Sequence, residues 1–172
     1  MLNFDNILQS YTQSPVQEAV AQIDLQFERL DQLLKADLSQ LDSIDESLFI
    51  YFNREEVFYL NRLGRKLLKR RAGAFEPPTV LEPTPIFWLE PSLQRAADDL
   101  EVMMSSQPKS DVLELVSLAW GKTWMAGTKY PIRNTSGRSI AVLFSGKEIP
   151  AAEQIHQASK HCRITRKESG NN

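Results

Sequence analysis

The stretch that decides the expected fold is "VLELVSLAWGKTWMAG", residues 112–127. Ser110 and Asp111 come directly before it, and both residue types cap helices because their side-chain oxygens accept hydrogen bonds from first-turn N–H groups. Gly127 closes the stretch, and glycine commonly follows the last turn of a helix. Residues 112–127 are therefore predicted to form a helix.

The tripeptide Gly121-Lys122-Thr123 inside this stretch matches the end of a nucleotide-binding P-loop. That motif requires a further glycine upstream, at the place that Val116 occupies here. The motif also follows a strand, whereas these residues are predicted to be helical. The match therefore does not indicate nucleotide binding.

Downstream, the pattern changes in "KYPIRNTSGRSIAVLFSG", residues 129–146. Two short stretches of apolar or β-branched residues flank residues 134–137, Asn-Thr-Ser-Gly, which are typical of a turn. This pattern predicts a β-hairpin whose second strand includes residues 140–144. A last helix is predicted to begin at Pro150, and residues 160–172 are expected to be a basic, flexible tail.

Upstream, residues 74–91 contain five of the nine prolines. Proline lacks an N–H donor and restricts the residue before it, so this segment is predicted to be an extended crossing that lies along the helices. A helix is predicted to begin at Pro91. The apolar residues expected on its inward side are Leu93, Ala96, Ala97, Leu100, Met103 and Met104.

The clearest helix start is at Ser14, which can cap a helix together with Pro15 at the first position and Gln17 as the partner in a capping box. Apolar residues then recur at steps of three and four, which places them on one helical stripe. We expect this stripe to contact a second helix of the chain, or alternatively a protein partner or a second copy of the chain. The stripe consists of Val16, Val20, Ile23, Phe27, Leu30 and Leu34.

A second capping box, Ser43 with Glu46, precedes "LFIYFNREEVFYLNRLGRKLLKRRAG", residues 48–73. This segment is apolar in its first half and basic in its second, and it ends at a glycine. Residues 14–73 are therefore predicted to form a helical hairpin.

The predicted fold class is mostly α (α+β), with four or five helices, a Pro-rich crossing and a small C-terminal β-hairpin. One domain is expected over residues 1–159, made of the helical hairpin 14–73, the crossing 74–91, and the helices and hairpin of 92–159. With 42% hydrophobic and 24% charged residues, the composition is that of a globular protein. The single cysteine, and the lack of a signal peptide or a long apolar run, predict a cytoplasmic protein that does not enter a membrane.

The net charge of −2 conceals four blocks of alternating sign. Residues 1–50 carry −7 and residues 74–118 carry −6, whereas residues 51–73 carry +5 and residues 119–172 carry +6. Two interpretations stay open. Either the acidic and basic elements neutralise one another within the fold, or the two basic blocks converge on one face that meets an anionic partner.

Metal, cofactor and catalytic chemistry have little support in the sequence. His156, His161 and Cys162 are too few for a structural zinc site, and no nucleophile motif such as G-x-S-x-G is present. We therefore expect no metal, no cofactor and no enzymatic activity. An enzyme whose site is assembled from distant carboxylates is kept as a third alternative.

The basic segments 62–71 and 122–138 carry the expected function, because cations beside hydroxyls and aromatic rings are groups that contact phosphates. We predict a non-enzymatic binding protein that is a subunit or regulator of a nucleic-acid-handling assembly. The alternative is a helical adaptor or chaperone that binds a protein, or another copy of itself, through its N-terminal helices. The expected nucleic-acid-binding residues are Arg62, Arg65, Lys66, Lys69, Arg70, Lys122, Lys129, Arg133 and Arg138.

Overall fold

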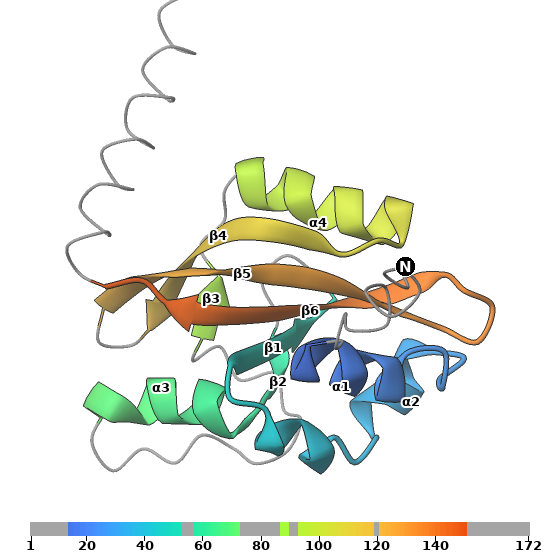
Figure 1. Ribbon diagram of the computed structural model, residues 1–172, viewed down its shortest axis with the longest axis horizontal. Coiled ribbons are helices and arrows are strands. Elements are labelled where there is room, and N and C mark those ends of the chain that lie inside the picture. The colour runs from blue at the N-terminus through green and yellow to red at the C-terminus, as the bar shows by residue number, and fades with distance from the viewer. Residues whose placement is uncertain (1–13, 53–56, 73–86, 90–92, 119–120, 151–172) are drawn as a thin grey trace, which may run out of the picture.

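A computed structural model describes residues 14–52, 57–72, 87–89, 93–118 and 121–150 of the chain. Within these residues a six-stranded antiparallel sheet has the strand order β2-β1-β6-β5-β4-β3 (Figure 1). The strands are β1 (Ser47–Tyr51), β2 (Val57–Leu60), β3 (Phe87–Leu89), β4 (Lys109–Leu118), β5 (Gly121–Arg133) and β6 (Ser139–Glu148).

Helices pack against both faces of this sheet. Figure 1 shows α4 along one side of β4 and β5, with α1 and α2 on the opposite side of the sheet. No helix in the described ranges is long and apolar enough to cross a membrane. The helical elements are α1 (Pro15–Ile23), α2 (Leu30–Leu34), the 3-10 turn η3 (Ser39–Ser43), α3 (Arg62–Ala72) and α4 (Leu93–Ser105).

The alternation of side chains along the strands divides the buried apolar residues into two cores. Leu48 and Ile50 of β1 belong to the first core, which α1, α2 and η3 complete. Phe49 and Tyr51 belong to the second core, to which α3 and α4 contribute. β1 is therefore buried on both faces, so it is apolar at successive positions and does not show the alternation of a half-buried strand.

The prediction of a mostly α fold is wrong, and residues 112–127 show why. They do not form a helix but lie in β4 and β5, which pair antiparallel from Val112–Gly127 to Leu118–Gly121. Along β4, Val112, Glu114 and Val116 are buried whereas Leu113 is exposed, which is the period of a strand. The predicted caps, residues 110–111, lie at a bulge in β4.

Gly127 does not end a helix. It lies inside β5 opposite Gly146 of β6, where a Cβ atom would be only 1.9 Å from the main-chain oxygen of Ser145. Glycine is therefore required by the close approach of two strands. The prediction of a helix end at Gly127 is therefore wrong, because the glycine is required by contact with a strand that is distant in the sequence.

The predicted helical hairpin over residues 14–73 is also wrong. α1 begins as predicted, with the capping box of Ser14 and Gln17, but it ends at Ile23. β1 and β2 occupy much of the segment that was expected to be the second helix, and in its described residues the helix is α3. The predicted partner in the second capping box, Glu46, instead accepts a hydrogen bond from the Ser145 hydroxyl of β6.

Two other predictions are confirmed in the described residues. β5 and β6 form the predicted hairpin, whose turn has Gly137 at φ 83°, in the left-handed region that favours glycine. A helix follows Pro91 as predicted, although its inward face differs, as described below. Residues 87–89 of the crossing form β3. The rest of the crossing, the helix predicted from Pro150 and the predicted tail lie outside the described residues.

Candidate ligand-binding groove

A groove opens at the edge of β5 that β4 does not reach. The pairing of these two strands begins at Lys109 and Lys129, so residues 130–133 of β5 extend beyond the start of β4. α1 and the connection from α4 to β4 border this edge, and the open groove between them has a volume of about 470 Å³. The lining residues are Gln17, Val20, Ala21, Asp24, Ser106, Gln107, Pro108, Tyr130, Pro131 and Arg133.

An ion pair between α1 and β5 forms the charged wall of the groove. The carboxylate of Asp24 accepts hydrogen bonds from the Arg133 main-chain N–H (2.7 Å to Oδ1) and from its Nε (3.0 Å to Oδ2). Nη2 of Arg133 also pairs with Oδ2, and this pairing raises the pKa of Arg133. The N–H of Leu25 donates to the Arg133 main-chain oxygen at 2.9 Å. The end of α1 is therefore tied to β5 through both main chain and side chain.

One residue of the lining and one residue next to the lining have strained backbones. Leu25, next to Asp24, has φ 60°, and Ser106, in the lining, has φ 54°. A positive φ is unfavourable for a side chain such as leucine and costs on the order of 1–2 kcal/mol. Such strain is found preferentially at binding sites, where the surrounding structure holds it in place. A third such residue, Asp111, lies at the bulge of β4, away from the lining.

The rest of the lining combines small apolar surfaces with neutral polar groups. Val20 and Ala21 come from α1, and Pro108 and Pro131 come from the α4–β4 connection and β5. Proline suits the free edge of β5 because it has no N–H to leave unpaired. Tyr130 also lines the groove, and burial is the main reason why its pKa is raised. The lining can therefore hold both an apolar group and a hydrogen-bonding group.

A second unusual feature, which we name the α4 charge cluster, lies where α4 faces β4, β5 and β1. Lys129 is 0% exposed, and its Nζ donates to Asp99 Oδ1 at 2.6 Å and pairs with Glu114. Nε of Arg95 lies 3.7 Å from both Asp99 Oδ2 and Glu114 Oε2. The Tyr51 hydroxyl donates to Asp99 Oδ1 at 2.8 Å. Paired charges thus attach α4 to the sheet, in addition to the apolar contacts of Val102 and Met103.

Burial changes the proton affinities in the α4 charge cluster. The pKa of Glu114 is raised because burial disfavours its charged form, an effect that the nearby Lys129 opposes. Burial is also the main reason why the pKa of Tyr51 is raised well above its usual value. Buried charges are a poor source of stability compared with apolar side chains of the same size.

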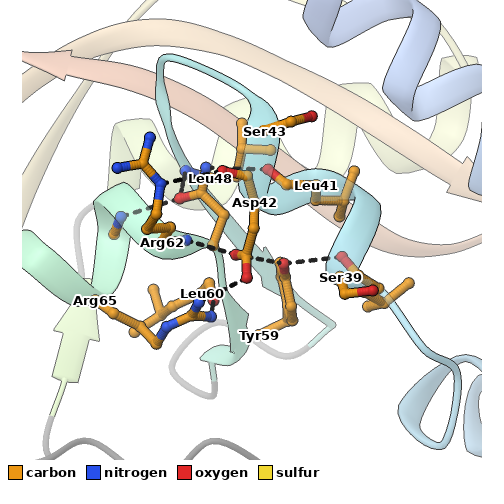
Figure 2. Close-up of polar contacts among 12 residues, drawn as sticks. Ser39, Leu41, Asp42, Ser43, Leu48, Tyr59, Leu60, Arg62 and Arg65 are labelled. Atoms are coloured by element: carbon orange, nitrogen blue, oxygen red, sulfur yellow. Dashed lines mark hydrogen bonds and ion pairs between the residues drawn. The ribbon is translucent and has the colours of Figure 1, made fainter.

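Asp42 of η3 contacts the basic start of α3 and pairs with one of its cations, Arg65 (Figure 2). Nη2 of Arg65 donates to Asp42 Oδ2 at 2.7 Å, and the main-chain N–H of Arg62 donates to Oδ1 at 2.6 Å. The Tyr59 hydroxyl donates to the same Oδ1 at 3.3 Å. The Asp42 carboxylate therefore accepts hydrogen bonds from both α3 and β2, and Arg65 is paired with an acidic residue of its own chain.

The predicted nucleic-acid function is wrong, because carboxylates of other segments hold key members of both basic segments. Lys129 is buried in the α4 charge cluster, Arg133 is paired with Asp24, and Arg65 is paired with Asp42. The first interpretation of the charge blocks, neutralisation within the fold, therefore holds at these three residues. Of the other predicted residues, Lys66, Lys122, Arg62 and Arg138 are exposed, and the side chains of Lys69 and Arg70 lie outside the described part.

The alternative function, a helical adaptor, is wrong as well. The helix that was to present an apolar stripe is divided into α1 and α2, separated by residues 24–29. Val16, Val20 and Ile23 are buried in the first core, against the sheet, and Phe27 and Leu30 are partly buried against the same core. Leu34 has intermediate exposure. The apolar stripe therefore packs against the sheet of the same chain.

Neither the groove nor the α4 charge cluster is predicted from the sequence. A signal for the cluster was present, because Arg95, Asp98, Asp99 and Val102 recur at three- and four-residue spacing on α4 and are all buried. The apolar residues of the helix, however, predict that the opposite face is buried. The groove left no comparable signal, since its lining comes from three separate parts of the chain.

Metal and nucleophile chemistry find no new support. The described residues contain no group of three or more side chains suited to hold a metal ion. His156, His161 and Cys162, which the sequence analysis considered, lie outside these residues.

Comparison with solved structures finds distant similarity. The PAS domain of a protein from Colwellia psychrerythraea is 13% identical, with 70% of this chain and 96% of that chain covered and a TM-score of 0.48. The phage VqmA–DPO complex is 18% identical, with 77% and 60% covered and a TM-score of 0.45. The dark structure of the blue-light photoreceptor Aureochrome1 LOV is 14% identical, with 77% and 93% covered and a TM-score of 0.45. No family model and no curated protein matches the sequence.

Proposed function

We propose that this protein is a ligand-binding domain that receives a small molecule in the groove between α1, β5 and the α4–β4 connection. The observation that carries the proposal is the groove itself, whose volume of about 470 Å³ lies in the range typical of small-molecule sites. Its lining offers apolar surface and a few polar groups, which is the usual composition of such a site. The proposal assigns binding rather than catalysis to the domain.

The strained backbone in and next to the lining supports this assignment. Leu25 and Ser106 both have positive φ values, although neither is glycine. Ser106 directly follows α4, where a left-handed residue commonly ends a helix. Leu25 is the more informative of the two, because its N–H donates to Arg133 and not to α1, and a binding site can use such strain to place neighbouring groups. Here the neighbours are Asp24 on one side and Gln107 on the other, and both line the groove.

The position of the groove also gives a route by which a ligand could act. Ser106 follows directly after α4, and residues 106–108 of the lining lead into β4. A ligand that contacts both α1 and this connection would bias the position of α4. The α4 charge cluster suits such movement, because a helix held by paired charges gains less from its contacts than one held by a close-packed apolar face. We therefore propose that the domain is sensory, with α4 as the responding element.

A nuclear magnetic resonance screen of small molecules against the isotope-labelled protein tests the proposal. We expect ligands to shift the amide signals of Val20, Ala21 and Gln107, and a subset to shift signals along α4. Ala21→Trp places a large ring in the groove and should abolish these shifts. Ala97→Trp, a change at an exposed alanine on α4 outside the lining, is the matched control and should leave them in place.

Two results would contradict the proposal. One is a screen in which no compound shifts the signals of the lining. The other is a set of shifts that Ala21→Trp and Ala97→Trp affect equally, because binding would then lie elsewhere.

A further inference from the structure

The charged groups of the groove form a closed pair. Among its lining residues, Asp24 and Arg133 are the charged ones, and they carry opposite signs. Both oxygens of Asp24 accept hydrogen bonds from Arg133. The side chain of Asp24 is only 11% exposed, whereas that of Arg133 is 34% exposed. The groove therefore presents no net charge to a ligand.

A charged ligand that takes the place of either partner has to open this pair. An anion that draws the guanidinium of Arg133 away would leave the largely buried Asp24 without its partner, and removing one partner of a buried ion pair is strongly unfavourable. The loss would also affect structure, because Asp24 accepts the Arg133 main-chain N–H and lies at the end of α1. A cation that competes for Asp24 would release Arg133 in the same way. An anionic ligand and a cationic ligand would therefore both weaken the ion pair that joins α1 to β5.

The remaining lining is suited to a neutral molecule. Gln17 and Gln107 present amide groups, which both donate and accept hydrogen bonds. Val20, Ala21 and Pro108 offer small apolar surfaces beside them. A molecule with a short apolar part and one amide-like group can use both kinds of surface without disturbing the ion pair.

We propose that the groove selects small, electrically neutral molecules with a short aliphatic part and an amide-like polar group, and that the Asp24–Arg133 pair rejects charged analogues. This inference rests on the proposed function, because it assigns a ligand class to the same groove. It goes beyond that function by assigning selectivity to one ion pair.

Three probes of equal chain length test the inference at neutral pH: butanamide, butanoate and butylammonium. Titrations followed by the amide signals of Ala21 and Gln107 give their dissociation constants. We expect butanamide to bind more tightly than either ion by about tenfold or more, which corresponds to about 1.4 kcal/mol. Equal or tighter binding of either ion to the unmodified protein would overturn the inference, while binding in the groove, and with it the proposed function, would stand.

A variant of the ion pair makes the test specific. Asp24→Asn keeps an oxygen that can accept the Arg133 main-chain N–H but removes the charge that holds the guanidinium, so butanoate should become the preferred probe. Glu18→Gln makes the same change in net charge at an exposed position of α1 outside the lining, and should leave butanamide preferred. Thermal unfolding of each variant establishes that it is folded.

The remaining outcomes are also decisive. If Asp24→Asn leaves the order of the three probes unchanged, the ion pair does not set selectivity and the inference fails. If the three probes do not bind but larger compounds from the screen do, the ligand class is wrong and the groove remains a binding site. If neither these probes nor the screen shifts the lining signals, the proposed function fails too.

Discussion

At the scale of single residues, several positions are set by contacts with distant segments. Lys129 is a charged residue in a strand, yet it is fully buried because Asp99 and Glu114 surround its Nζ. Gly127 lies in the same strand, where β6 approaches too closely for a side chain. Neither environment can be inferred from the neighbouring sequence, because the partners lie in other elements.

Gly127→Ala is expected to lower the free energy of unfolding by about 2–4 kcal/mol, because the new Cβ would overlap main-chain atoms of residues 145–146. Urea unfolding measures the change. Gly137→Ala is the comparison: nothing lies within 4 Å of its Cβ position, and only its φ of 83° is unfavourable, so about 1 kcal/mol is expected. Equal losses at the two sites would contradict the close approach of β5 and β6.

At the scale of elements, α4 is inverted with respect to the usual amphipathic helix. Its buried face includes Arg95, Asp99 and Val102, whereas Leu100 and Met104 are 57% and 77% exposed. The prediction that these two apolar residues face inward is wrong, because burial of the paired charges against β4 and β5 decides which way the helix faces.

Substitutions on α4 should reflect this orientation. Leu100→Gln and Met104→Gln are expected to change the free energy of unfolding by no more than about 0.5 kcal/mol, because both side chains already face solvent. Val102→Ala should cost about 2 kcal/mol, because Val102 is fully buried in the second core. Urea unfolding of the three variants provides the measurement. A large loss at Leu100 or Met104 would show that this face is covered.

The α4 charge cluster also predicts a dependence of stability on pH. The pKa of Glu114 is raised by burial, so the folded protein holds this proton more tightly than the unfolded chain does. The resulting contribution to stability is fully present below the ordinary pKa of 4.5 and is lost as the pH rises through the raised value. Comparing unfolding of the unmodified protein with that of Glu114→Gln from pH 4 upward isolates this contribution.

The stability of the unmodified protein relative to Glu114→Gln should therefore fall as the pH rises above about 4.5. Asp111→Asn, at an exposed acidic residue of the same strand, is the control and should show no matching trend. A relative stability of Glu114→Gln that does not vary with pH would contradict a raised pKa at this position.

At the scale of the whole molecule, the alternating charge blocks meet one another across the fold. Asp24 of the first acidic block pairs with Arg133 of the last basic block, and Asp42 pairs with Arg65 of the second block. Lys129 pairs with Asp99, which belongs to the third block. The blocks therefore cross-link the α1 side, the α4 side and η3 with their neighbours, and the groove lies where one of these pairs joins α1 to β5.

The sequence by itself determined those features whose causes are local. The capping box of Ser14 and Gln17 starts α1, a turn around residues 134–137 joins two strands, and a helix follows Pro91. Each depends on residues within a few positions of one another, so a local pattern is enough to predict it.

Only the tertiary structure decided the sheet, the inverted face of α4 and the groove. β1 is apolar at successive positions because helices cover both of its faces, and this removes the alternation that distinguishes a strand from a helix. The charges of α4 are buried because Glu114 of β4 and Lys129 of β5 neutralise them. The groove exists because residues 130–133 of β5 extend past the point where β4 begins, a consequence of strand register that no segment specifies alone.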